Sequence, residues 1–226
     1  MIPGAAPAAT GRTPSCTARA PSVHCALVKA ATIDGRSARS AKTRNAIADA
    51  LLDLLAEGAL RPTAREIADR AAVSVRSVYV HFEDLEDLFC VAAGRHLARI
   101  APMLAPVAAT GSVAERAQGL VSQRSRLYEE TRAVGRATRL HAAFSPTLAR
   151  ILRDVHTLAR NDLERVFATE LAPLGAAHRV DTVAVLEIVT GPEAWETLRE
   201  GHAFTTDRAR QCVTDSIVRQ LQAVCG

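Results

Sequence analysis

At 226 residues, the chain is long enough for one large domain or two small ones with real hydrophobic cores. Hydrophobic residues make up 48% of it and aromatic residues only 4%, a composition that favours helices. The net charge of +4 permits nucleic acid as a partner, and no apolar run approaches the roughly 20 residues of a membrane span, so we expect a cytoplasmic protein without membrane contact.

The first 36 residues are rich in Ala, Pro, Ser, Thr and Gly and show no sustained periodicity. They predict a disordered tail, residues 1–36, ahead of the first folded domain. The tail is also basic. Residues 1–44 hold seven Lys or Arg and one Asp, a net charge of +6, so the remaining residues sum to −2.

From about Ser37 the pattern becomes helical. Ile47, Leu51 and Leu55 recur at the spacing of one helix face, and Gly58 closes the segment. This amphipathic helix opens a predicted domain at residues 37–101.

Three helix starts then follow within about 25 residues. Thr63 and Glu66 form a capping box, in which each residue satisfies an amide of the other. Ser74 is a good N-cap for a second short helix, and Asp84 with Asp87 predicts a second box at the start of a longer one. Helices this short do not stand alone, so they must pack on each other.

The two short helices, at about 63–82, predict a helix-turn-helix that reads the major groove of DNA. We expect Val75 and Val78 to face the core and Arg76 to face the bases, where its guanidinium can bind guanine bidentately. The predicted DNA-contacting residues are Thr63, Arg65, Ser74, Arg76, Ser77, Tyr79 and His81.

The rest of the chain also has helical periodicity and no strand-like alternation, which predicts an all-α fold with a second helical domain at residues 102–226. Gly191-Pro192 predicts a kink in the penultimate helix. The expected helices lie near 112–130, 132–142, 147–170, 177–200 and 206–224.

Residues Ala64 to Leu88 resemble the signature of the TetR family of transcriptional regulators. A threonine-capped helix with an Ile-Ala pair is followed by an Ala-x-Val-Ser turn, then by Tyr-x-His-Phe and a leucine-rich helix. The resemblance covers roughly residues 39–100. It implies a two-domain helical fold, a homodimer formed through the last two helices, and a ligand cavity in the second domain.

Matched position by position, the resemblance places the family's phosphate contacts on Thr63, Tyr79 and His81. It places the base contacts on Arg65, Arg76 and Ser77.

The chain departs from the family pattern at two positions. Ala72 stands where glycine is usual, and a left-handed alanine there would cost about 1 kcal/mol. Leu85 stands where the family often has a phosphate-binding lysine. A basic tail that enters the minor groove would compensate for the lost contact. A disordered tail without a function, or one encoded before the true start codon, would not compensate for that contact.

In the second domain, cavity-lining side chains can be proposed only from their chemistry, and a core role is the readier interpretation of each taken singly. The candidates are Met103, Tyr128, His141, Phe144, Phe167 and Trp195. A stripe on the last helix fits either a dimer interface or the internal core, and the resemblance favours the interface. Its members are Val213, Ile217, Leu221 and Val224.

The sequence thus predicts a dimeric, ligand-responsive regulator, more readily a repressor than an activator, that binds a near-palindromic DNA site. Double-stranded DNA, a second copy of the chain and an unidentified small molecule are the expected partners.

An enzyme on a helical bundle is one alternative, but no Glu-x-x-His spacing, nucleophile elbow or phosphate loop is present, so no catalytic, metal or cofactor site is predicted. An interaction module that no longer binds DNA is the other, and Ala72 and Leu85 keep it open.

Overall fold

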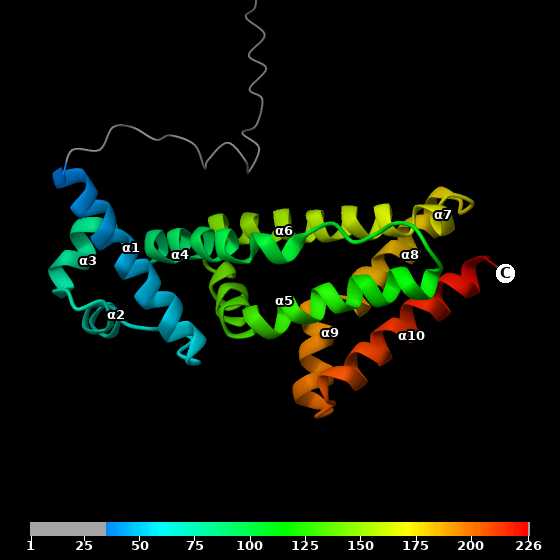
Figure 1. Ribbon diagram of the computed structural model, residues 1–226. Helices are drawn as coiled ribbons and strands as arrows, with labels where there is room; N and C mark the ends of the chain where they lie inside the picture. Colours follow the sequence, from blue (N-terminus) through cyan, green and yellow to red (C-terminus); the bar gives the residue numbers. More distant parts are fainter. Residues whose placement is uncertain (1–34, 226) are drawn as a thin grey trace, which may run out of the picture. The chain divides into compact units, whose positions relative to one another are not determined.

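The computed structural model describes residues 35–225, with side chains described over 38–223, and every regular element in that range is helical (Figure 1). The predicted all-α class is therefore confirmed. Residues 1–34 of the predicted tail lie outside the described residues. None of the described helices is long and apolar enough to cross a membrane.

Four helices make up the N-terminal part: α1 (Gly35–Ala56), α2 (Ala64–Arg70), α3 (Val75–His81) and α4 (Leu85–Ile100). They enclose a shared core that α5 (Val113–Ala142) and α6 (Pro146–Val166) also join. Its largest fully buried side chains are Ile47, Leu51, Ile67, Phe82, Leu88 and Leu148.

The helix caps form largely as the sequence predicts. The backbone N–H of Thr63 donates to the Glu66 carboxylate at 2.7 Å, and the Glu66 N–H donates to the Thr63 hydroxyl at 3.3 Å. Ser74 caps α3. Asp84 accepts from the backbone N–H of Asp87 at 2.8 Å, but the reciprocal half of the second box is absent. These caps hold two seven-residue helices in place between α1 and α4.

The turn between α2 and α3 contains a strained residue. Ala72 has φ of +54°, in the left-handed region that disfavours a side chain. We expect Ala72→Gly to raise the free energy of unfolding by about 0.5–1 kcal/mol, because glycine adopts this conformation without a clash. Urea denaturation followed by circular dichroism measures the change.

The neighbouring residue provides a matched control, since Ala71 has φ of −79° and is unstrained. Ala71→Gly should lower stability by up to about 1 kcal/mol through the entropy of the unfolded chain. A loss of the same size in Ala72→Gly would contradict strain at this turn.

The C-terminal part consists of one long helix and several shorter elements around it. In chain order they are η2 (Ala101–Leu104), α5 (Val113–Ala142), α6 (Pro146–Val166), α7 (Ala168–Leu171), α8 (Ala176–Val189), α9 (Pro192–Glu196), the π-helical turn η3 (Thr197–Gly201) and α10 (Thr206–Cys225).

Two expectations about these helices were wrong. The helices predicted near 112–130 and 132–142 are one helix, α5, of 30 residues, because no proline interrupts this stretch and Gly135 is tolerated inside a helix. Conversely, Gly191-Pro192 does not kink a continuous helix. α8 ends at Val189, and Pro192 begins α9, since proline lacks the amide that would continue the earlier helix.

The apolar stripe predicted for a dimer interface faces the inside of the chain at three of its residues. Val213, Ile217 and Leu221 are at most 6% exposed and pack into the core of their own chain. α10 lies along α5, so its apolar stripe meets that helix (Figure 1). The side chain of Val224 lies outside the described ones. The periodicity of apolar residues shows that one face of a helix is buried, but not whether the same chain or a second copy covers that face.

Candidate DNA interface and ligand cavity

The recognition helix α3 buries one side and exposes the other. We call α1–α4 (Gly35–Ile100) the head. Val78 is 1% exposed and packs α3 against the hydrophobic core of the head, whereas Tyr79 is 54% exposed. Val75 was expected in the core but is 39% exposed. It lies at the first residue of α3, three positions before Val78, where its side chain is turned about 60° away from that residue. The exposed face is therefore broader than the sequence predicted.

Arg76 lies at the centre of this exposed face. It forms no ion pair within the described part of the chain, so its guanidinium is available to an external acceptor. Arg65 is also extended into solvent, with its side chain 85% exposed and only a 4.0 Å contact to Asp69. Two solvent-exposed guanidiniums on neighbouring helices suit a polyanionic partner.

Other predicted DNA-contacting side chains already take part in hydrogen bonds within the chain or are partly buried. The hydroxyl of Thr63 is hydrogen-bonded to Glu66 at 2.7 Å within the capping box. The Ser74 hydroxyl accepts the backbone N–H of Ser77 at 3.1 Å, and the Ser77 side chain is half-buried, as is that of His81. All seven residues lie on or beside α2 and α3, and their contacts with DNA stay predictions.

Sequence reasoning missed Val80, which is 69% exposed on the same face as Arg76. The two residues are four positions apart and therefore neighbours on the helix surface. An apolar side chain beside an arginine in a major groove can contact the methyl group of thymine. The available signal was its spacing from Arg76 within a helix whose buried position is Val78.

The start of α4 differs from a phosphate-binding surface. Leu85 is half-buried against the head core, and acidic residues flank it on both sides. Asp87 is 3.6 Å from Arg44 of α1. This corner of the head therefore carries negative charge where the family often places a lysine, and it offers little attraction to a DNA backbone.

Of the six predicted cavity residues, only Tyr128 and Trp195 line the same cavity. Phe167 is fully buried in the C-terminal core, and Phe144 is 71% exposed. Met103 lines a separate open groove of about 590 Å³ beside α5. The structure thus does not bring the six together.

His141, the sixth candidate, lies at the junction between the two parts of the chain. Its ring centroid is 3.9 Å from that of Phe89 on α4, and its Nε2 is 3.0 Å from the carbonyl oxygen of Leu60. Because His141 belongs to the last turn of α5, this helix contacts the head directly.

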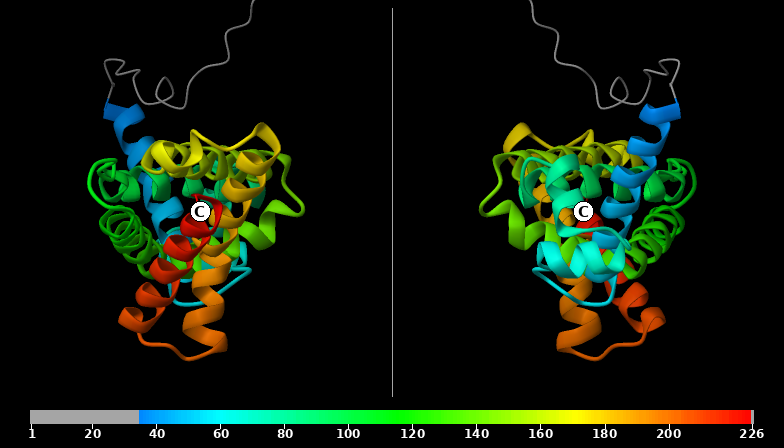
Figure 2. Two further views of the ribbon diagram at one scale, coloured as in Figure 1. Left: turned by 90° about the vertical axis from the view of Figure 1, so that its right-hand side faces the viewer. Right: turned by 90° about the vertical axis from the view of Figure 1, so that its left-hand side faces the viewer.

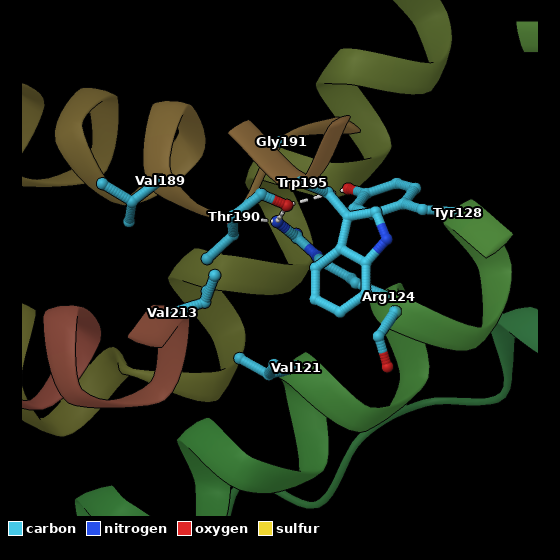
Figure 3. A pocket seen from close by; sticks show the side chains of 9 residues that line it. Val121, Arg124, Tyr128, Val189, Thr190, Gly191, Trp195 and Val213 are labelled. Carbon is cyan, nitrogen blue, oxygen red and sulfur yellow. Dashed lines mark hydrogen bonds between the residues drawn. The ribbon is translucent and has the colours of Figure 1, made fainter. Parts of the chain in front are cut away.

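The cavity with Tyr128 and Trp195 lies where α5 meets the end of α8, the start of α9 and α10 (Figure 3). Three valines and Gly191 make much of its wall apolar, and Arg124, Ser125, Tyr128 and Thr190 add polar groups. The free space is only about 10 Å³, close to the room one water needs.

The polar groups of the wall are held by hydrogen bonds. The Tyr128 hydroxyl donates to the carbonyl oxygen of Thr190 at 2.8 Å (Figure 3). The Trp195 indole N–H donates to Glu129 at 3.0 Å. Burial raises the pKa of Tyr128, which keeps its hydroxyl protonated as a donor. Burial works to raise the pKa of Glu129, but hydrogen bonds from Arg199 and Trp195 outweigh it and the pKa is lowered.

Residues 47–90 match the sequence model of the family described as bacterial regulatory proteins, tetR family. A transcriptional regulator from Rhodococcus sp. Rha1 has a similar fold, with a TM-score of 0.63 and 24% identity over 80% of this chain and 96% of that one. A TetR transcription regulator from Haloarcula marismortui ATCC 43049 gives a TM-score of 0.61 and 16% identity, over 81% and 98% of the two chains. No curated protein matches the chain.

Proposed function

We propose that the chain, whose residues 47–90 match the tetR family of bacterial regulatory proteins, is a dimeric, ligand-responsive regulator of that family that binds a near-palindromic operator. In this proposal the chain regulates transcription and carries out no catalysis. The observation that carries the DNA-binding part of the proposal is the exposed face of α3, where Arg76 has no partner among the described residues and Val80 lies beside it. Repression is the expected output.

In this proposal α3 enters the major groove. Arg76 binds the O6 and N7 of a guanine, Val80 contacts a neighbouring thymine methyl, and Tyr79 donates to a phosphate. Two copies would place two α3 helices in successive major grooves, with half-sites about one helical turn or somewhat more apart. The acidic start of α4 removes one backbone contact, so base contacts carry a larger share of the affinity.

The DNA-binding proposal predicts a specific loss in Arg76→Ala. A selection from random-sequence duplexes supplies the operator, and fluorescence anisotropy then measures affinity at several salt concentrations. We expect Arg76→Ala to weaken operator binding by about 1–3 kcal/mol and to relax the preference at one base pair, because a bidentate contact to guanine is lost.

Arg153→Gln is the matched control, since Arg153 is exposed on α6, outside the head. It should leave operator affinity unchanged. If the selection enriches no sequence and binding does not depend on salt, the chain is an interaction module without DNA recognition.

The exposed face of α8 supports the dimeric part of the proposal. Val180 and Ile188 are 67% and 70% exposed, and Ala184 and Val185 lie exposed between them, so this side of the helix is largely apolar, with the exposed Asp181 among these residues. α8 packs beside α10 (Figure 2), and the two helices are the ones through which the resemblance implies dimerisation. A second copy related by a two-fold axis would bury the same face twice.

We expect Ile188→Asp to weaken dimerisation by at least about 100-fold, because two carboxylates would enter one apolar interface. Sedimentation equilibrium measures the dissociation constant. Leu104→Asp places the same charge at an exposed leucine of η2 and should leave the dimer intact. An Ile188→Asp variant as dimeric as the parent chain would place the interface elsewhere.

Coupling between the cavity and the head is proposed to run through α5. This helix carries Arg124 and Tyr128 at the cavity and His141 at the junction with the head. The 17 positions from Arg124 to His141 span about 25 Å of helix, so a displacement at one end moves the other. A ligand that favours the displaced arrangement would change the spacing of the two heads in a dimer.

A further inference from the structure

Arg124 is a buried arginine whose charge has no carboxylate partner within residues 38–223. Only 7% of the residue is exposed. Its guanidinium donates to the carbonyl oxygen of Ala159 at 2.8 Å and to the hydroxyl and carbonyl of Thr190. All of these acceptors are neutral. Buried charges in proteins are ordinarily paired, so this arrangement is unusual.

The other buried arginine of the described chain shows the contrast. Arg116 is 5% exposed and pairs with the Glu170 carboxylate at 2.5 Å. Near Arg124 the carboxylates are already engaged: Glu129 pairs with Arg199 at 2.7 Å, and Glu193 lies 3.3 Å from Arg139. Neither of these two carboxylates pairs with Arg124, which forms no ion pair within residues 38–223.

The end of α8 compensates the charge only in part. Thr190 is the C-cap of α8, and a helix C-terminus carries the equivalent of about half a negative charge. Arg210 also reaches this wall, where its Nε donates to the Ser125 hydroxyl at 2.7 Å, and its own charge pairs with the exposed Asp207 at 3.5 Å. The charge of Arg124 therefore stays without a full counterion, and one monovalent anion would balance it.

The other residues of the cavity wall indicate the chemistry of the rest of the ligand. Val121, Val189 and Val213 are apolar, and the Trp195 and Tyr128 rings lie beside the Arg124 guanidinium (Figure 3). A planar carboxylate matches the two parallel N–H groups of a guanidinium, and the valines and aromatic rings would bury a hydrocarbon part.

We propose that the effector is a small organic carboxylate whose carboxylate pairs with Arg124 while its hydrocarbon body lies against Trp195 and the valines. This inference rests on the proposed ligand-responsive function and names the ligand class for it. The present space of about 10 Å³ is too small for such a molecule. The acid would take over the Arg124 hydrogen bonds to Ala159 on α6 and Thr190 at the end of α8, and thereby release both helices from α5.

Trp195 allows a direct test, because it is the single tryptophan of the chain and lines the cavity. The probes are benzoate and hexanoate, each compared with its neutral amide, and inorganic phosphate. Intrinsic fluorescence of the full chain should change saturably with at least one of the two acids, and at least about tenfold more weakly with the matching amide. An amide that binds as well as its acid, no saturable change with either acid, or phosphate that binds as tightly as the acids would each overturn the proposal.

A variant pair locates the binding group. Arg124→Gln should weaken binding of the responding acid at least about tenfold, whereas Arg153→Gln should bind it as the parent chain does. Circular dichroism checks that Arg124→Gln is folded, and if it is not, the acid–amide comparison in the parent chain decides alone.

Fluorescence anisotropy on operator DNA, measured with the same preparation, distinguishes failure of the proposed ligand class from failure of the proposed function. A chain that binds its operator but neither acid overturns only the ligand class, while one that binds no DNA overturns the proposed function itself.

Discussion

Replacing Phe82 with alanine should lower the free energy of unfolding by about 3–5 kcal/mol and abolish operator binding. Phe82 is 2% exposed at the end of α3, and the guanidinium of Arg44 on α1 lies 4.4 Å from its ring centroid. The substitution opens a cavity between the recognition helix and the helix that supports it, and it also removes a cation–π contact. Urea denaturation measures the stability, and anisotropy on the selected operator measures binding.

Phe144→Ala makes the same chemical change on the surface, because Phe144 is 71% exposed. Its effect on stability should stay within about 0.5 kcal/mol. If Phe82→Ala retained full operator affinity, α3 would not depend on this core for its position, and the proposed role of α3 would fail with it.

Glu170→Ala should destabilise the folded chain by about 3–5 kcal/mol, because it leaves Arg116 buried without its counterion. The two side chains are 12% and 5% exposed, and Arg116 also donates to the carbonyl oxygen of Val166 at 2.6 Å. The large effect comes from the unpaired cation that remains and not from the intrinsic strength of the pair. Urea denaturation near neutral pH measures it.

The exposed pair Arg179–Glu164 is the matched control. Its side chains are 44% and 38% exposed, so Glu164→Ala should cost at most about 1 kcal/mol. A double variant, Arg116→Met with Glu170→Leu, should recover most of the stability lost in Glu170→Ala, since no charge stays buried. Equal losses in Glu164→Ala and Glu170→Ala would contradict a buried pair.

The pH dependence has a defined sign. The hydrogen bond from Arg116 lowers the pKa of Glu170 in the folded chain. A carboxylate with a lowered pKa adds stability above its unfolded pKa and loses it as the pH falls through the folded value. The difference between the parent chain and Glu170→Ala should therefore be full near neutral pH and shrink as the pH drops below the ordinary range of glutamate.

The sequence alone determined the helix-turn-helix, because its signals are local. Thr63 and Ser74 mark helix starts through hydrogen bonds that span three residues. The cost expected for a left-handed Ala72 now applies, since its φ is +54°. Where the energetics depend on near neighbours in the chain, spacing and residue type are sufficient evidence.

The tertiary structure alone decided which surface each helix face meets. Ile217 has the periodicity of an interface residue but is buried against the chain's own core, while the outward apolar face is on α8. Aromatic content likewise suggested His141 and Phe144 as cavity residues, yet one lies at the junction and the other in solvent.

Arg124 shows the same limit most clearly. Its significance depends on burial and on carboxylates engaged elsewhere, and both arise from helices that lie 35 to 66 residues away along the chain. Hydrophobic burial is non-directional, so a sequence pattern specifies that a face is buried without specifying its partner. Only the packed helices determine whether a charge ends up paired, exposed, or buried and ready for a ligand.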